Sequence, residues 1–286
     1  MLSCSAVTQA RAVHRSLTGV VGAFATVGRH VVFAVEAIAG VPTALRRYFK
    51  HVMYHVGEVS FGYASLLAGG GTIGIVFAMS AVAAMMVGVE TQRGLELIGM
   101  TSLSGMLSAL ANTRELAPVV ASIALAAKVG TGFTAQLGAM RISDEIDALD
   151  AMAVKSVPFL ASTRLIATAV CVVPIYMVGL LSAFVATRLV VVTFQGNSAG
   201  TYDYYFHLAL SPADLWYSLT KAVVFAVIVG IVHCSYGYHA TGGPEGVGRA
   251  AGRALRTSIL AIGITDVVLT LALWGLVPTV PGVGLA

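Results

Sequence analysis

The sequence predicts an all-α membrane protein with five transmembrane helices, an interfacial amphipathic helix before them and a short cytoplasmic helix between the second and third. The 286 residues are 57% hydrophobic and only 10% charged, whereas soluble domains carry about 25% charged residues. The mean hydropathy of +0.87 agrees. Long apolar runs separate the charges, and about 20 such residues cross the hydrocarbon core of a bilayer. These runs must be helices, because lipid satisfies no open backbone groups and they do not alternate like barrel strands.

The segment before the first span is predicted to be an amphipathic helix in the cytoplasmic leaflet. Basic residues follow it after Pro42, as is typical of interfacial helices. Packing of the same helix against the bundle is the alternative. We therefore divide the chain into a cytoplasmic and interfacial arm, residues 1–56, and a transmembrane domain, residues 57–286. The apolar residues at helical spacing are Phe24, Val27, Val31, Val35 and Ile38.

Charged residues mark the edges of the spans, and each predicted span is long enough to cross the membrane. Lys128 lies within the second span, Lys221 lies near one end of the fourth, and Asp266 lies within the fifth. The predicted spans are residues 61–89, 116–140, 165–187, 215–238 and 259–277.

The distribution of Lys and Arg predicts the orientation in the membrane. An odd number of spans places the two ends of the chain on opposite sides. The side that holds the N-terminal arm has twelve basic residues and the other side has four, so we expect a cytoplasmic N-terminus and an extracytoplasmic C-terminus. The twelve are Arg11, Arg15, Arg29, Arg46, Arg47, Lys50, Arg141, Lys155, Arg164, Arg249, Arg253 and Arg256. The four are Arg93, Arg114, Arg188 and Lys221. This topological use of the basic excess argues against a nucleic-acid partner.

A short acidic segment follows the second span and is the most informative part of the chain. Ser143 is placed to cap a helix whose first turn holds two carboxylates, favourable at the positive end of the helix dipole. An amphipathic helix of this kind offers a rigid surface to a cytoplasmic partner. A solvated connection between two spans is the alternative. The residues of interest are Arg141, Ile142, Asp144, Glu145, Ile146, Asp147, Leu149 and Met152.

Several ionisable residues lie at or within the spans, where such residues usually serve function. Arg114 and Glu115 precede Pro118 at the predicted outer edge of the second span. Neighbouring helical residues point in different directions, so we expect at least one of the two to face the protein interior; anchoring both at the interface is the alternative. A pairing of Lys128 with Asp266 is a further hypothesis.

No catalytic signature is present in the sequence. There is no G-x-x-x-x-G-K-[ST] motif, so we expect any nucleotide energy to come from another polypeptide. The three cysteines, Cys4, Cys171 and Cys234, lack metal-binding spacing. His233 and His239 are six residues apart, on opposite helix faces. We therefore predict a non-enzymatic chain without a metal or cofactor of its own.

Three motifs stand out in the second span and the segment after it: Arg114-Glu-Leu-Ala-Pro-Val-Val, Lys128-Val-Gly-Thr-Gly and Gln136-Leu-Gly-Ala-Met-Arg-Ile-Ser-Asp-Glu-Ile-Asp-Ala-Leu. A glycine-rich loop, Gly242-Gly-Pro-Glu-Gly-Val-Gly, lies before the fifth span. Together they resemble the MlaE/YrbE family of permeases over roughly residues 57–274, and the three motifs are the most specific part of the match. The glycine-rich loop and the long arm are most similar to the YrbE permease subunits of Mce lipid transport systems.

The resemblance implies the permease subunit of an ABC-type lipid transporter in the inner membrane, with the MlaE-type fold. ATP and Mg²⁺ would bind a cytoplasmic ATPase dimer, MCE-domain proteins would lie outside, and a second YrbE-type permease would complete a heterodimer. Residues 142–152 would be the coupling helix that docks on the ATPase. Arg114, Glu115 and Pro118 would line a lipid pocket between the two permeases.

Two other classes of function fit the residues without the resemblance. The first is an ion-coupled secondary lipid carrier that uses Glu115, Lys128 and Asp266 as a relay. The second is a membrane scaffold that transports nothing.

Overall fold

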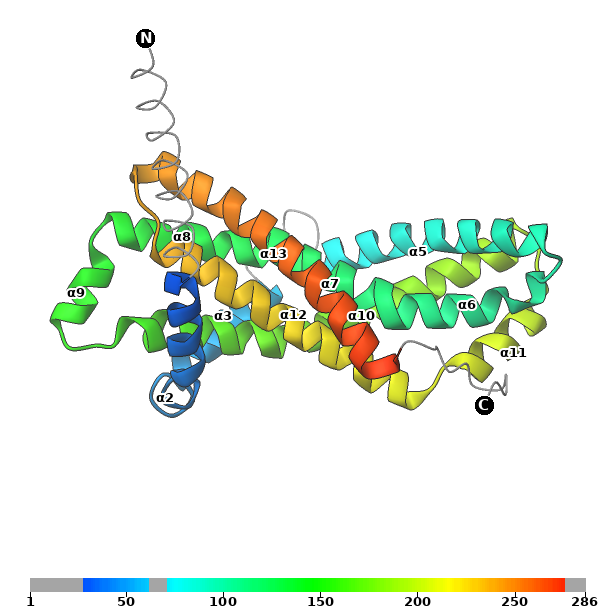
Figure 1. The fold of residues 1–286 in the computed structure, drawn as a ribbon, viewed down its shortest axis with the longest axis horizontal. Helices are drawn as coiled ribbons and strands as arrows, with labels where there is room; N and C mark the ends of the chain where they lie inside the picture. Colours follow the sequence, from blue (N-terminus) through cyan, green and yellow to red (C-terminus); the bar gives the residue numbers. More distant parts are fainter. Residues whose placement is uncertain (1–27, 62–70, 276–286) are drawn as a thin grey trace, which may run out of the picture.

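The computed structural model describes residues 28–61 and 71–275 of the chain, and these residues form helices joined by short connections. Five helical stretches are long and apolar enough to cross a membrane, as predicted. They run along the long axis of the molecule (Figure 1), so the predicted fold class is confirmed. The five are Gly71–Leu97, Thr101–Ile142, Pro158–Phe194, Pro212–Tyr238 and Gly243–Trp274.

The N-terminal part begins with a helix over residues 28–39, followed by α2 (Val41–Arg47) and α3 (Phe49–Phe61). The first helix crosses the long axis of the bundle (blue in Figure 1). One face of it packs on the bundle: Phe33 is buried, and Ser162 donates a 2.7 Å hydrogen bond to the Ala37 carbonyl. The opposite face is apolar and exposed, with Val31, Val35 and Ile38 more than half exposed. One face of this helix therefore packs on the bundle, and the other has the exposed apolar side chains expected of an interfacial helix, whose place in the cytoplasmic leaflet stays a prediction.

Of the residues used to predict that helix, Phe24 and Val27 lie outside the described part of the chain. The first span, α5 (Gly71–Leu97), ends eight residues beyond the predicted boundary at residue 89, because Glu90 and Arg93 pair with each other on its exposed surface. Charges paired in this way are compatible with a continuing helix.

The second span is longer than predicted and contains two π-helical turns. It consists of η1 (Thr101–Leu103), α6 (Ser104–Ala111), η2 (Asn112–Leu116), α7 (Ala117–Leu125), η3 (Ala126–Gly130) and α8 (Thr131–Ile142). The predicted edge at residue 116 is wrong, since the helix begins fifteen residues earlier, at Thr101. Arg114 and Glu115 therefore lie inside the span, about 20 Å from its start at 1.5 Å per residue.

The third and fourth spans contain the predicted ones, whereas the fifth begins sixteen residues before residue 259 and ends at Trp274, three residues before the predicted end at 277. The fifth begins early because Arg249, Arg253 and Arg256 lie on an exposed face of a continuing helix. The third consists of η4 (Pro158–Ser162), α10 (Thr163–Arg188) and η5 (Leu189–Phe194). The helix α11 (Ala199–Ala209), which the sequence analysis did not predict, connects it to α12 (Pro212–Tyr238), and α13 (Gly243–Trp274) follows.

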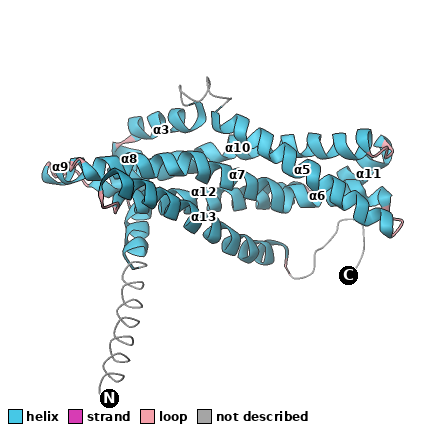
Figure 2. Ribbon diagram, turned by 90° about the horizontal axis from the view of Figure 1, so that it is seen from above, coloured by secondary structure: helices cyan, strands magenta, loops and turns pink. Residues whose placement is uncertain are grey.

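The core lies where α10 packs on α5 and α12, and where α12 packs on α8 and α13. Close approach of α8 and α12 requires a glycine: a Cβ at Gly237 would lie 2.9 Å from the Thr134 carbonyl oxygen. Figure 2 shows α13 on one side of the molecule and α3 and α10 on the other. The outer face of α13 is exposed and apolar, as at Leu260, Ile264 and Val268.

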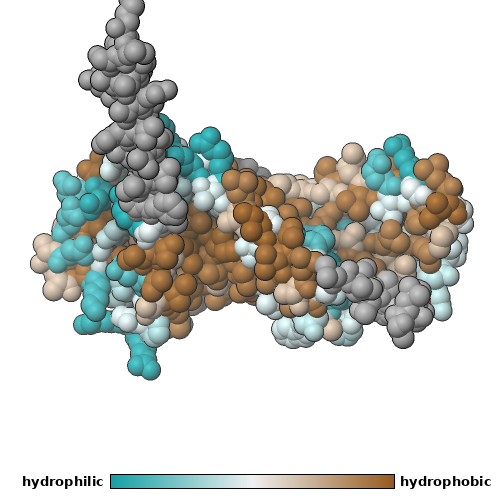
Figure 3. Space-filling view, in the orientation of Figure 1, coloured by the Kyte–Doolittle hydropathy of each residue, from teal (hydrophilic) through white to brown (hydrophobic). Residues whose placement is uncertain are grey.

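The space-filling view shows a broad hydrophobic band over the middle of the molecule (brown in Figure 3). Hydrophilic residues gather towards its two ends. A band of exposed apolar side chains bounded by polar ends matches a protein that is solvated by lipid around its middle.

The short acidic helix between the second and third spans exists as α9 (Glu145–Ala151). It forms the extreme end of the bundle, at the left in Figure 1. The predicted cap is wrong: Asp144, with a left-handed φ of 58°, precedes the helix, and Ser143 instead donates to the Ala139 carbonyl. The predicted helix over residues 142–152 therefore begins later than expected. Ile142 is the last residue of α8, and the chain turns before α9 begins.

Candidate functional site

The π-helical turn η2 exposes backbone carbonyls inside the second span. Pro118 lacks the N–H that would bond to the carbonyl of Thr113 or Arg114 in the regular ladder. Two side chains of α12 supply donors in place of the missing N–H: Ser218 donates to the Thr113 carbonyl, and Lys221 Nζ lies 2.8 Å from the Arg114 carbonyl oxygen. The proline in the second span thus creates the acceptors that bind α12.

Lys221 is fully buried and is the centre of a charged cluster between the second span, α12 and α13. Its ammonium lies 2.7 Å from Asp266 Oδ1 and 3.2 Å from Glu115 Oε2. It also donates to Thr270 Oγ1 at 2.8 Å, and Thr270 donates in turn to Glu115 Oε1 at 2.8 Å. A buried ammonium requires such partners, because an unpaired charge in an apolar interior is very costly.

A second ion pair extends the cluster towards the start of α12. Arg114 Nη2 lies 3.2 Å from Asp214 Oδ2, and both side chains are about nine-tenths buried. Trp274, the last residue of α13, donates its indole N–H to the other oxygen of Asp214. The guanidinium of Arg114 and the ammonium of Lys221 lie 5.3 and 5.5 Å from the Trp274 ring centroid, within the range of cation–π attraction.

The cluster opens to the molecular surface at Glu115. Its side chain is 45% exposed, whereas that of Asp266 is 17% exposed and that of Lys221 is not exposed at all. With all groups ionised, the two cations and three carboxylates leave one net negative charge. An amphiphilic molecule at this opening would meet ionised groups beside the apolar face of α13.

The predicted pairing of Lys128 with Asp266 is wrong, because Lys221 occupies that position. Lys128 lies in η3, thirteen residues or about 20 Å along the second span from Glu115. The part of α13 that holds Asp266 packs at the level of Glu115 and not at the level of Lys128. Arg114 faces inward, as expected for at least one of the two residues, whereas Glu115 contacts α12 and α13 but stays partly exposed. The sequence analysis missed the roles of Asp214 and Lys221, although Lys221 is the only charged residue between Asp214 and Glu245.

The helix α9 has a buried and an exposed side. Ile146 is fully buried and Leu149 packs beside it on the core, whereas Ile142 and Met152 are exposed, so the apolar residues of this segment are divided between the core and the surface. The carboxylates of Asp144 and Glu145 are on the exposed surface together with Asp147, whose side chain is 60% exposed and pairs with Arg141 at 2.6 Å. Acidic and apolar groups are therefore both accessible at this end.

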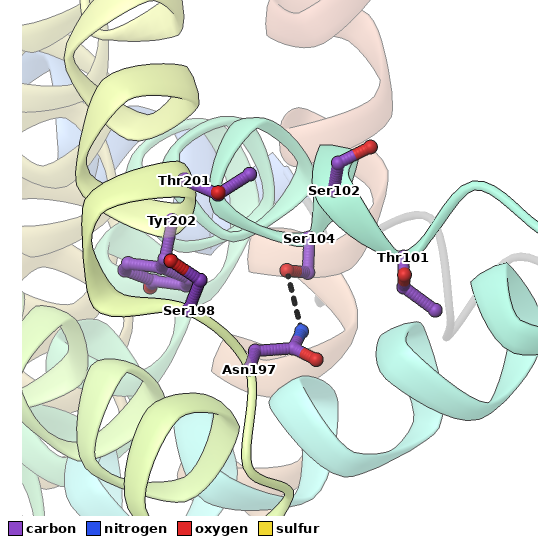
Figure 4. Close-up of a pocket in the computed structure, with 7 residues that line it drawn as sticks. All are labelled: Thr101, Ser102, Ser104, Asn197, Ser198, Thr201 and Tyr202. Atoms are coloured by element: carbon purple, nitrogen blue, oxygen red, sulfur yellow. Dashed lines mark hydrogen bonds between the residues drawn. The ribbon is translucent and has the colours of Figure 1, made fainter.

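A polar pocket of about 200 Å³ lies at the opposite end of the bundle (Figure 4). Asn197 crosses it, donating to Ser104 Oγ at 3.3 Å and to Gln92 Oε1 at 2.8 Å. These bonds tie the connection before α11 to α5 and the second span, which is a structural role. The lining residues are Thr101, Ser102, Ser104, Asn197, Ser198, Thr201 and Tyr202.

Histidine, cysteine and carboxylate side chains do not gather in groups of three that could hold a metal ion anywhere in the described ranges. His233 is fully buried and lies within hydrogen-bond distance of Thr134 Oγ1 (2.9 Å) and Ser258 Oγ (3.3 Å). It therefore connects α8, α12 and α13 as a packing residue.

Fold and site together define a multi-pass membrane protein with an ion-paired centre inside an apolar bundle, an arrangement typical of transport proteins. The family model for the permease MlaE matches residues 62–272. The chain is 32% identical to a probable ABC transporter permease protein of Synechocystis over 77% of this chain and 80% of that protein. It is also 32% identical to a probable ABC transporter permease protein of Rickettsia bellii, over 56% and 62%.

A plant relative is the chloroplastic protein TRIGALACTOSYLDIACYLGLYCEROL 1 of Arabidopsis thaliana. It is 29% identical over 70% of this chain, and the match spans 57% of its own length. The chain belongs to the MlaE permease family. It is therefore the non-catalytic permease subunit of an ABC transporter, and its ATPase partner is a separate polypeptide.

Proposed function

We propose that this chain is the permease subunit of an ATP-driven lipid transporter of the Mce type, which imports lipids or fatty acids across the cell envelope. The Arabidopsis relative is named after a galactolipid, which supports a lipid substrate for this chain. The similarity to YrbE subunits supports the Mce type. Membership of an ABC permease family argues against the ion-coupled carrier and the scaffold.

The observation that carries this proposal is the opening of the charged cluster at Glu115. A lipid has a polar headgroup and apolar chains, and the opening places ionised groups beside the exposed apolar face of α13. In this proposal Arg114, Glu115 and Pro118 line a lipid pocket between two permease subunits, with a second YrbE-type chain as the partner. Lys221 and Thr270 keep the Glu115 carboxylate in place.

The coupling to ATP hydrolysis is assigned to α9 and its neighbours. The ATPase dimer would dock on the exposed acidic and apolar groups of this end, and its closure would push on α9. Because Ile146 anchors α9 in the core, a push would reach the bundle rather than bend a free loop. The coupling residues are Arg141, Ile142, Asp144, Glu145, Ile146, Asp147, Leu149 and Met152.

The proposed orientation places α9 and the arm, residues 1–56, on the cytoplasmic side of the inner membrane. The opposite end of the transmembrane domain, residues 57–286, then faces outward, and MCE-domain proteins would receive or deliver lipid there. The excess of Lys and Arg at the α9 end supports this orientation.

The proposal is tested with the permease, its paralogue, its ATPase and its MCE proteins reconstituted in liposomes that contain a fluorescent lipid. We expect lipid movement that requires ATP and falls at least tenfold in Glu115→Gln. The matched control is Glu90→Gln, the same change at an exposed carboxylate of α5. Lipid movement that needs no ATP, or that is equal in the two variants, would refute the proposal.

A further inference from the structure

Two adjoining pockets lie at the end of the bundle that also carries α9, far from the Lys221 cluster. They form where the first helix, the end of α12 and the start of α13 meet. The first, of about 240 Å³, is lined by Arg29, His30, Tyr236, His239, Thr241 and Arg253. The second, of about 430 Å³, shares Thr241 and Arg253 with it and adds Arg249, Gly252 and Arg256. The second is within the range of about 300–1,000 Å³ that is usual for small-molecule sites.

The pockets are strongly basic. Their described lining residues include four arginines and no carboxylate. Arg249 pairs with Glu245, but no ion pair involves Arg253 or Arg256 among the described residues. The sequence before Arg29 contains no Asp or Glu that could neutralise them. Burial, together with the charges of His239, Arg29 and Arg253, lowers the pKa of His30, as expected in a positive potential.

The wall of the first pocket is held rigidly by ring contacts. The His30 ring stacks on Tyr236 with centroids 4.6 Å apart, and its Nδ1 lies 2.6 Å from Ser235 Oγ. His239 contacts His30 edge-on at 6.0 Å and donates from Nδ1 to the Ser235 carbonyl at 2.9 Å. The first helix and α12 are therefore fixed against each other, and the pocket is present before any ligand binds.

Lipid-facing residues begin on both sides of the pockets. On α13, the exposed apolar face starts at Ile259, less than one turn after Arg256, and continues through Leu260. On the first helix, Val32 and Val35 are about 60% exposed. A basic pocket between two such faces lies at the level where hydrocarbon gives way to headgroups.

We propose that these pockets bind the phosphate group of an anionic lipid of the adjacent leaflet, as a site separate from the Glu115 opening. The guanidinium groups of Arg253 and Arg256 make charge-assisted hydrogen bonds to the phosphate. The acyl chains lie along the exposed apolar faces of α13 and the first helix. The site would stabilise the first helix on the bundle, and it does not depend on the proposed substrate or direction of transport.

The test is native mass spectrometry of the full-length chain in detergent, titrated with dioleoyl phosphatidylglycerol or with zwitterionic dioleoyl phosphatidylcholine. We expect at least one phosphatidylglycerol to bind about tenfold more tightly than phosphatidylcholine. Arg253→Gln/Arg256→Gln should remove this preference. The control Arg46→Gln/Arg47→Gln removes the same charge from exposed residues of α2 and should change the affinity less than about twofold.

Because Arg253 and Arg256 are exposed, the variant should melt within a few degrees of the wild type. Equal losses in the variant and the control would show a general surface-charge effect and overturn the proposal. So would equal binding of the two lipids. Inorganic phosphate at low millimolar concentration that displaces phosphatidylglycerol would assign the pocket to a soluble phosphate compound and overturn the assignment to a lipid.

Discussion

At the scale of single residues, Lys221 is the buried cation at the centre of the charged cluster. It contacts Asp266, Glu115, Thr270 and the Arg114 carbonyl, so that one ammonium links α12 to the second span and to α13. This carbonyl lacks the backbone N–H donor that a residue other than proline at position 118 would supply in a regular α-helix. The carbonyl that lacks a backbone donor and the buried ammonium that needs acceptors thus satisfy each other.

Replacement of Lys221 with methionine should destabilise the protein by about 3–5 kcal/mol, because it leaves Asp266 buried without its cation. The double variant Lys221→Met/Asp266→Asn should recover part of this loss. Thermal unfolding in detergent measures both, as a double-mutant cycle. Lys50→Met, at an exposed position of α3, is the control. The absence of any recovery in the double variant would mean that the pair contributes no interaction of its own.

Gly130 gives a second test at this scale. A Cβ at this position would lie 2.6 Å from Cδ2 of the fully buried His233 ring. Gly130→Ala should therefore destabilise the protein by about 1–3 kcal/mol through overpacking. Gly132→Ala adds the same methyl group two residues away, where nothing lies within 4 Å, and should be neutral or stabilising. Equal melting temperatures for the two variants would contradict this packing.

At the scale of elements, α9 combines an anchored side with an accessible one. Ile146 is fully buried, while Asp147 and Met152 are exposed. A substitution at the buried residue tests the stability of the permease. A substitution at an exposed residue tests contact with a partner. The two effects can therefore be measured separately. Variants of each kind therefore test the coupling role without relying on loss of activity alone.

The double variant Asp147→Lys/Met152→Glu should weaken association with the ATPase at least tenfold while the permease keeps its melting temperature. Ile146→Ala should instead destabilise the permease by about 2–5 kcal/mol. Co-purification and thermal unfolding give the two measurements. Glu90→Lys, at an exposed position of α5, is the control. Normal co-purification of the double variant would exclude α9 as the docking element.

At the scale of the whole molecule, the polar ends and the apolar middle define two membrane surfaces. Glu145 of α9 and Tyr204 of α11 are exposed at opposite ends of the long axis. The cysteines Cys171 and Cys234 are buried, so they add little background to thiol labelling once Cys4 is replaced by serine.

In sealed cells, Tyr204→Cys should react with a membrane-impermeant maleimide, whereas Glu145→Cys should react only after the inner membrane is permeabilised. This follows from the excess of basic residues at the α9 end. The reverse pattern would invert the proposed orientation. Reaction of both variants from outside would contradict a bundle that crosses the membrane.

Much of the fold was predictable because crossing hydrocarbon is a property of a continuous apolar run. The five spans, the exposed apolar face of the first helix and the existence of a helix at α9 all follow from local composition and periodicity. The ends of the spans were less predictable. Charged residues such as Glu90 and Arg114 indicate boundaries in the sequence, but ion pairs allow both helices to continue past them.

The sequence by itself determined that this chain has five helical spans, and its motifs indicated a permease in which at least one of Arg114 and Glu115 faces the protein interior. Only the tertiary structure decided that Lys221 and Asp214, rather than Lys128, complete that centre. The physical reason is that each pair joins residues far apart in the chain. Which charges meet depends on the depth and rotation of each helix in the packed bundle, and those are set by the contacts among all the spans.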